Sequence, residues 1–187
     1  MTPEPRFPTL APDTYSEAQI KAEADFRATR NMGFSAPWHV MIRSPELLTH
    51  AQRLGFYLRN HCAFSGLMAE FATLLVVRDW TQDFEWNAHK TNGLAAGLSA
   101  EMIEDIAQGR RPNVSGDLEI IWNFVTELLR TRRVSDASYA QALARFGEQG
   151  VVDLTGLVGY YSMLAMVLNV GRVGAPVGAQ RLGRFPE

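Results

Sequence analysis

Apolar residues recur at intervals of three and four along most of the chain, the spacing that places them on one face of an α-helix. The segment 117–132 is the clearest case, with apolar side chains at Ile120, Ile121, Phe124 and Leu128. No segment shows sustained alternation of apolar and polar residues, and no Asn-Gly or Asp-Gly turn joins two such segments. The pattern therefore predicts an all-α fold.

Residues that start and stop helices divide this pattern into about eight helices. The predicted helices span residues 16–30, 44 to about 61, 67–80, 83–97, 99–109, 117–132, 135–146 and 151–170, with a short helical stretch at 38–42. Two glycines at 147 and 150 are expected to separate the last two helices.

The helical pattern is continuous, which predicts a single domain over residues 15–171. The segment 1–14 is rich in proline and is expected to form an extended arm, because proline is incompatible with the interior of a helix. Residues 172–187 are expected to form a C-terminal tail.

Composition narrows the class of protein further. The chain has 187 residues, with 18 Lys plus Arg against 20 Asp plus Glu, so it lacks the basic excess typical of nucleic-acid binders. Cys62 is the one cysteine, which excludes an internal disulfide and a cysteine-based zinc site. The N-terminus has no apolar signal region, and polar residues interrupt the apolar run 151–170. We expect a soluble cytoplasmic protein that binds neither membrane nor nucleic acid.

Three titratable residues are the candidate chemistry. Glu85 and His89 stand four positions apart, so on a helix they share one face. Glu70 lies in the apolar run 67–77, where an unpaired acid is expensive to bury. Two carboxylates beside an imidazole can hold and tune a proton donor at neutral pH. The spacing alone also fits a surface pair on one helix, with Glu70 favoured by the helix dipole.

The segment 70–99 resembles the carboxymuconolactone decarboxylase family, whose members share the fold of alkylhydroperoxidase D-like proteins. The resemblance is carried by Glu70, by Glu85-Trp86-Asn-Ala-His89 and by Ala95-Ala-Gly97-Leu-Ser99. It extends from about Pro45 to Asn169. The peroxidase branch of this fold has cysteines seven and four positions before the histidine, where this chain has Gln82 and Glu85. Without either thiol the chain cannot run thiol peroxidase chemistry, so the resemblance is to the decarboxylase branch.

That resemblance implies a cofactor-free lyase that acts on a small carboxylated lactone or a related intermediate of aromatic-compound degradation. Because the conjugated lactone carbonyl accepts the electrons left by CO2, the reaction requires no metal and no organic cofactor. The implied catalytic residues are His89 as proton donor, with Glu85 and Glu70 holding its ring. Family members form trimers or hexamers, so the resemblance also implies a homo-oligomer, in which the arm 1–14 can wrap a neighbouring subunit.

Three further residues are candidates for binding the substrate. Arg78 lies two turns after Glu70, on the same face of the predicted helix, and can bind a carboxylate through its two nitrogens, or form a salt bridge to a surface acid. Trp86 and Phe84 can form a dry wall that strengthens polar contacts.

Two other functions stay open from the sequence. The same Glu/His site can run a hydrolysis or an isomerisation, because a fold does not fix a reaction. The chain can also be a non-catalytic protein that binds a small molecule. The sequence does not identify the substrate.

Overall fold

A computed structural model of the chain describes residues 4–30 and 32–184. Within these residues the fold is entirely helical, which confirms the prediction of an all-α protein with about eight helices. The helices are α1 (Glu17–Thr29), α2 (Trp38–Met41), α3 (Pro45–Asn60), α4 (Gly66–Asp79), α5 (Asp83–Ala96), α6 (Ala100–Ala107), α7 (Asp117–Thr131) and α8 (Asp136–Gly171), preceded by the 3-10 helix η1 (Pro12–Thr14).

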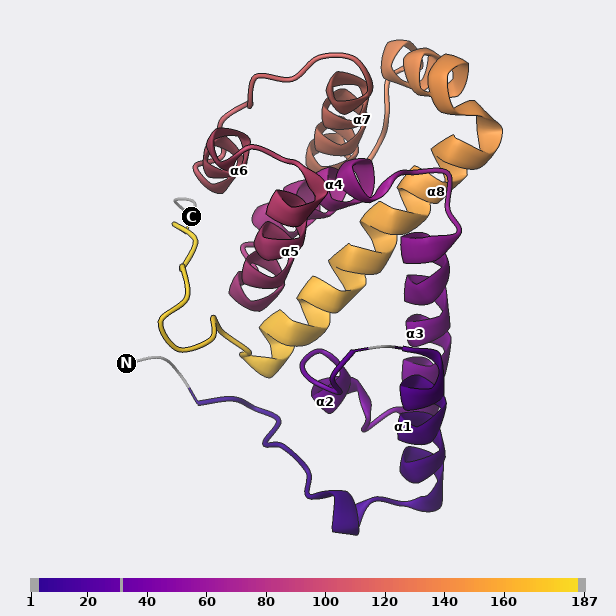
Figure 1. Ribbon diagram of the computed structural model, residues 1–187, viewed down its shortest axis with the longest axis vertical. Coiled ribbons are helices and arrows are strands. Elements are labelled where there is room, and N and C mark those ends of the chain that lie inside the picture. The colour runs from indigo at the N-terminus through magenta and orange to yellow at the C-terminus, as the bar shows by residue number, and fades with distance from the viewer. Residues whose placement is uncertain (1–3, 31, 185–187) are drawn as a thin grey trace.

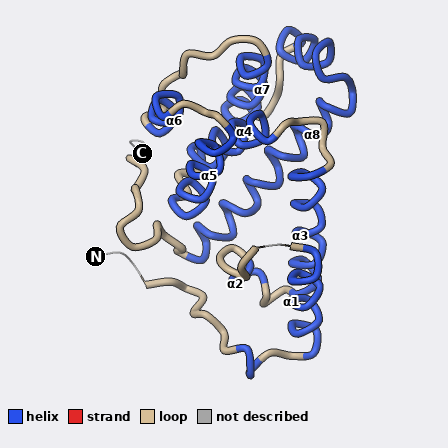
Figure 2. The backbone as a smooth tube through the Cα atoms, in the orientation of Figure 1, coloured by secondary structure: helices blue, strands red, loops and turns tan. Residues whose placement is uncertain are grey.

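The long helix α8 runs diagonally through the molecule and organises the rest (Figure 1). On one side it packs against α4 and α7, and α4 in turn packs against α5. On the other side it packs against α3, which pairs with α1 (Figure 1). The tube view shows that the described segments before α1 and after α8 are loops, apart from the short η1, and run outside the packed helices (Figure 2).

The helix α4 is the most enclosed element, because α5, α7 and α8 all cover it. Every residue from Phe71 to Arg78 is buried, including Thr73 and the Arg78 side chain. A helix that is apolar on all sides needs such surroundings. Burial of α4 matters for the site, because Glu70 stands at the start of this buried run.

The break expected across residues 147–150 is narrower than predicted. The segments 135–146 and 151–170 form one element, α8, whose path kinks at Gly147 alone. Gly147 has φ 70° and ψ 178°, a backbone conformation that only glycine adopts without strain. By length and apolarity α8 is the one described helix that would be able to cross a membrane, although half of its most apolar stretch is buried inside the structure. A core helix has the same properties.

The described part of the N-terminal arm lies against its own chain. The backbone N–H of Arg6 donates to the carbonyl of Gly171, and the Arg43 guanidinium lies 5.1 Å from the centre of the Phe7 ring. Residues 12–14 form η1, so the arm is not extended throughout. The proposed contact with a neighbouring subunit stays a prediction, and residues 1–3 and 185–187 lie outside the described residues.

One buried carboxylate joins α8 to the end of α3. Asp153 accepts a hydrogen bond from the Tyr57 hydroxyl at 2.9 Å and another from the backbone N–H of Ala63 at 2.9 Å. Asp153 is only 6% exposed, so these two donors replace the water that an ionised carboxylate requires. The acid that interrupts the apolar sequence of α8 is therefore a structural link between two helices.

We expect Asp153→Ala to lower the free energy of unfolding by about 1–3 kcal/mol, the usual cost of removing hydrogen bonds to a charged group. Urea denaturation followed by circular dichroism measures the change. Tyr57→Phe removes only one of the two bonds and should cost less. Equal stability of Asp153→Ala and the wild-type protein would contradict the structural role of this carboxylate.

Candidate functional site

The helix α5 carries two of the three candidate residues, and both of its ends are fixed. At its start the Gln82 side chain accepts hydrogen bonds from the backbone N–H groups of Phe84 and Glu85, at 2.6 and 3.2 Å. The same amide donates to the carbonyl of Val173 at 2.8 Å, which ties α5 to the residues after α8. At the other end Gly97 has φ 104°, the left-handed conformation that commonly ends a helix.

Glu70, Glu85 and His89 lie together, although Glu70 comes from α4 and the other two from α5. The Nδ1 atom of His89 is 2.6 Å from the Oε2 atom of Glu70. On the other side of the ring, Nε2 is 3.4 Å from the Oε2 atom of Glu85. The imidazole is 1% exposed, against 17% for the Glu70 side chain and 5% for that of Glu85. The ring is therefore held between two carboxylates inside the protein.

This arrangement keeps His89 charged. Burial by itself lowers the pKa of a histidine, but the neighbouring Tyr161 and the hydrogen bonds to Glu70 and Glu85 outweigh it and raise the pKa of His89 to about 10. With a proton on each nitrogen, the imidazolium donates to Glu70 through Nδ1 and directs its Nε2–H toward the Glu85 carboxylate. At neutral pH the site holds one imidazolium between two acids.

The raised pKa predicts how stability depends on pH. The folded protein binds the His89 proton more tightly than the unfolded chain does, whose histidine has a pKa near 6.5. The stabilisation is complete below pH 6.5 and is lost as the pH rises toward 10, with a slope of at most about 1.4 kcal/mol per pH unit.

We therefore expect the free energy of unfolding to fall between pH 7 and pH 10, and His89→Gln to flatten that decline. Urea denaturation at a series of pH values measures both proteins. An equally steep decline in the variant would show that another group is responsible.

A small cavity of about 110 Å³ opens beside this cluster. His89 and Glu85 line it, whereas Glu70 lies behind the imidazole and is not part of its wall. Arg30 and Arg59 also line this cavity. Cavities that hold drug-sized ligands have volumes of roughly 300–1,000 Å³, so this one has room only for a small molecule.

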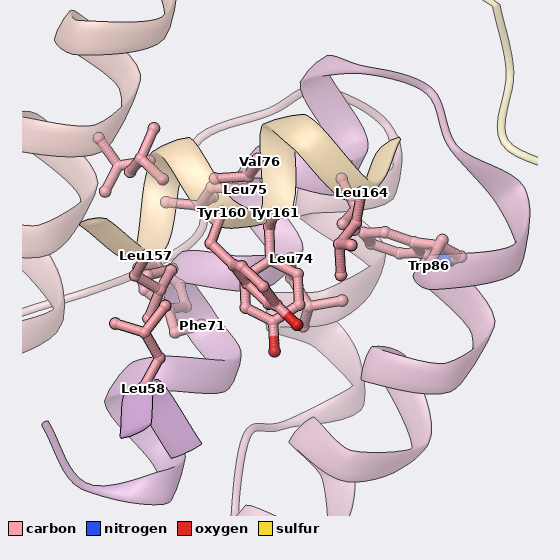
Figure 3. Close-up of a cluster of buried hydrophobic side chains, with 14 of the residues drawn as sticks. Leu58, Phe71, Leu74, Leu75, Val76, Trp86, Leu157, Tyr160, Tyr161 and Leu164 are labelled. Atoms are coloured by element: carbon pink, nitrogen blue, oxygen red, sulfur yellow. The ribbon is translucent and has the colours of Figure 1, made fainter. Parts of the chain in front are cut away.

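Two adjacent tyrosines of α8 complete the polar wall of the cavity. Figure 3 shows the Tyr160 and Tyr161 rings side by side, with both hydroxyl oxygens on the same side of the cluster. The Tyr161 ring meets the His89 ring edge to face, with 4.8 Å between the ring centres. Burial raises the pKa of Tyr160, so its phenol stays neutral. The neutral Tyr160 phenol supplies a hydrogen-bond donor next to the charged residues.

Arg78 lies away from this cavity. It lines a separate pocket between α4, α6 and α7, with Trp122 and Arg130, and its Nη1 atom donates to the Thr81 hydroxyl at 3.4 Å. The interpretation that Arg78 and Glu70 share a face was wrong, because eight helical residues rotate the direction by about 80° beyond two full turns. The structure gives no support to Arg78 as a ligand for a molecule bound at His89.

The two aromatic candidates of α5 have different places. Phe84 lines the cavity, the position proposed for it from the sequence. Trp86 is fully buried in the hydrophobic core and does not line the cavity. Figure 3 shows its ring beside Leu164 of α8. Successive positions on α5 point in different directions, which is why residues two apart have separate environments.

The remaining candidates for chemistry lie elsewhere. Cys62 follows α3, and its thiol donates to the Leu58 carbonyl at 2.9 Å, outside the cavity. Among residues 4–30 and 32–184, no group of three or more His, Cys, Asp and Glu is arranged to hold a metal ion. The His89 ring is not arranged as a metal ligand, because each of its nitrogens is already directed at a carboxylate.

Sequence reasoning missed four further residues that line the cavity: Arg30, Arg59, Tyr160 and Tyr161. One signal was present, since two adjacent phenols inside an apolar helix need partners for their hydroxyl groups. Arg30 and Arg59 occupy the last turns of predicted amphipathic helices, where basic residues are common and carry no special signal.

Comparison of the chain with protein-family models gave no match, and the search of curated proteins also gave none. The likeness of residues 70–99 to the carboxymuconolactone decarboxylase family therefore remains a prediction from the motif.

Proposed function

We propose that this protein is a cofactor-free lyase of the carboxymuconolactone decarboxylase type, acting on a small carboxylated lactone or a related intermediate of aromatic-compound degradation. One observation carries the proposal: a His89 imidazolium held between Glu70 and Glu85 opens onto a small cavity that two guanidinium groups also line. A buried titratable residue with a strongly raised pKa, lying in a cavity, is a typical mark of a functional site.

The two nitrogens of His89 have different tasks in this proposal. The short 2.6 Å contact between Nδ1 and Glu70 is a charge-assisted hydrogen bond that fixes the ring. The 3.4 Å contact between Nε2 and Glu85 is longer than a normal N–H···O hydrogen bond. A substrate in the cavity therefore competes readily for the Nε2 proton, so Nε2 is the donor and Glu70 is a positioning residue.

The reaction requires one bond to break and one proton to move. The bond between the ring carbon and the carboxylate breaks, and its electron pair enters the conjugated lactone as a dienolate while CO2 leaves. The Nε2 proton of His89 then passes to a ring carbon, and water returns a proton to the imidazole. Positioned proton transfer of this kind contributes roughly 10²–10⁴ in rate.

The other polar groups of the cavity stabilise the developing charge. Arg59 is exposed overall, and its guanidinium lies close enough to Tyr161, beside His89, to interact with that hydroxyl. Preorganised donors of this kind stabilise an enolate oxygen more than they stabilise a neutral carbonyl. Phe84 covers one side of the cavity and limits the entry of water.

The direct test is to incubate the purified protein with 4-carboxymuconolactone and to follow CO2 release together with the proton NMR spectrum of the ring. Enzyme-dependent CO2 release with the appearance of the decarboxylated lactone supports the proposal. A changed ring spectrum without CO2 would indicate isomerisation or hydrolysis by the same residues. Saturable binding without any change in the lactone would indicate a non-catalytic binding protein.

We also propose a cytoplasmic location, on the basis of the sequence alone. The family resemblance further leads us to propose a homo-oligomer. An apolar groove whose lining includes Phe7, Leu47, Met166 and Val170 lies on the surface and is consistent with a subunit contact. Light scattering tests the oligomer, and a mass equal to one chain would refute it.

A further inference from the structure

Arg30 is a buried cation whose charge no carboxylate balances. Its side chain is 8% exposed, and none of the ion pairs among residues 4–30 and 32–184 includes it. The Nη2 atom donates to the Gln52 carbonyl at 2.5 Å, and the guanidinium lies 5.5 Å from the centre of the Trp38 ring. Its Nε atom is buried and has no hydrogen-bond partner in the described part of the chain.

Such a residue is costly unless something compensates its charge. The contacts with Gln52 and Trp38 replace only part of the hydration that a buried guanidinium loses, and no carboxylate supplies a counter-charge. Because Arg30 lines the same cavity as His89, an anion that enters this cavity reaches both residues. Arg59, which lines the same cavity, adds a second guanidinium at a more exposed position.

We propose that Arg30 is the specificity-determining residue of this cavity: it binds the carboxylate of a small carboxylic acid, and Arg59 supports it from the more exposed side. A guanidinium presents paired N–H donors that match the two oxygens of a carboxylate. Arg30 precedes the part of the chain that resembles the decarboxylase family, which begins near Pro45. The motif therefore does not include this residue.

The inference rests on the proposed function only for the orientation of the substrate in the cavity. A carboxylate held by Arg30 is stabilised as an anion, which opposes its loss as CO2. The carboxylate at Arg30 is therefore retained, and the reacting end of the molecule is the part that contacts His89 and Glu85, which line the same cavity. Binding of an unreactive carboxylate tests the role of Arg30 without any turnover.

The experiment uses isothermal titration calorimetry with two probes, furan-2-carboxylate and its neutral counterpart furan-2-carboxamide. We expect the wild-type protein to bind the carboxylate at least tenfold more tightly than the amide. Arg30→Gln should weaken carboxylate binding at least tenfold and leave amide binding within twofold. Arg30→Lys keeps the charge but not the paired donors, so its affinity for the carboxylate should lie between those of the wild-type protein and Arg30→Gln. Arg27→Gln is the matched control, because Arg27 lies on the same helix but is exposed and pairs with Glu23.

Several results would overturn the inference: no saturable binding of the carboxylate, equal affinity of the wild-type protein for both probes, or full affinity in Arg30→Gln. The comparison of the two probes on the wild-type protein stands even if a variant fails to fold, and thermal denaturation checks folding. If the lactone is not decarboxylated but Arg30 still selects the carboxylate, the proposed function fails and the assignment of Arg30 holds. If the lactone is decarboxylated but Arg30→Gln binds the carboxylate as tightly as the wild-type protein does, the assignment of Arg30 fails and the proposed function holds.

Discussion

His89→Gln is expected to lower kcat for lactone decarboxylation by roughly 10²–10⁴, the contribution of a positioned proton donor. Glutamine retains a hydrogen-bonding side chain near Glu70 but has no proton to transfer to carbon. KM should change much less than kcat, since the cationic wall at Arg30 and Arg59 stays intact. Steady-state assays of CO2 release measure both constants. His50→Gln, on the exposed face of α3, is the matched control and should behave as the wild-type protein does.

The two acids should respond differently from each other. Glu70→Gln removes the charge behind Nδ1, lowers the pKa of His89 and moves the alkaline limb of the pH profile to lower pH. Glu85→Gln changes a wall of the cavity and should also affect substrate binding. A loss of activity in Glu70→Gln with an unchanged pH profile would contradict the positioning role. Unaltered kcat in His89→Gln would refute the proposed mechanism as a whole.

Trp86→Ala is expected to lower the free energy of unfolding by about 3–5 kcal/mol, the usual cost of removing a large aromatic ring from a core. Trp86 is fully buried among the residues of α4 and α8, so the substitution leaves a cavity that its neighbours fill only in part. Urea denaturation followed by circular dichroism measures the effect. Trp86→Phe keeps most of the ring and should recover much of the loss.

Phe84→Ala provides the comparison, because Phe84 lines the cavity and is only partly buried. We expect this variant to alter KM for the lactone and to change stability far less than Trp86→Ala does. If Trp86→Ala instead raised KM while leaving stability unchanged, Trp86 would be a binding residue and its placement in the core would be wrong.

The sequence determined the local structure to a large extent, because helix formation depends on spacing and on residues at helix ends. The four-residue spacing of Glu85 and His89 already placed both on one face, and Gly97 already marked the end of their helix. It did not reveal that the break in α8 is confined to Gly147, because a glycine within a helical pattern is compatible with both a kink and an end.

The tertiary structure decided which groups meet at the candidate site. Glu70 contacts His89 only because α4 packs against α5, and Arg30 and Arg59 reach the cavity because α3 packs against α8 and α1 packs against α3. Helical periodicity orders residues around one axis but carries no information on how separate axes pack. For that reason the sequence correctly predicted an all-α fold, but could not show that Arg78 lines a different pocket or that Arg30 lines the same cavity as His89.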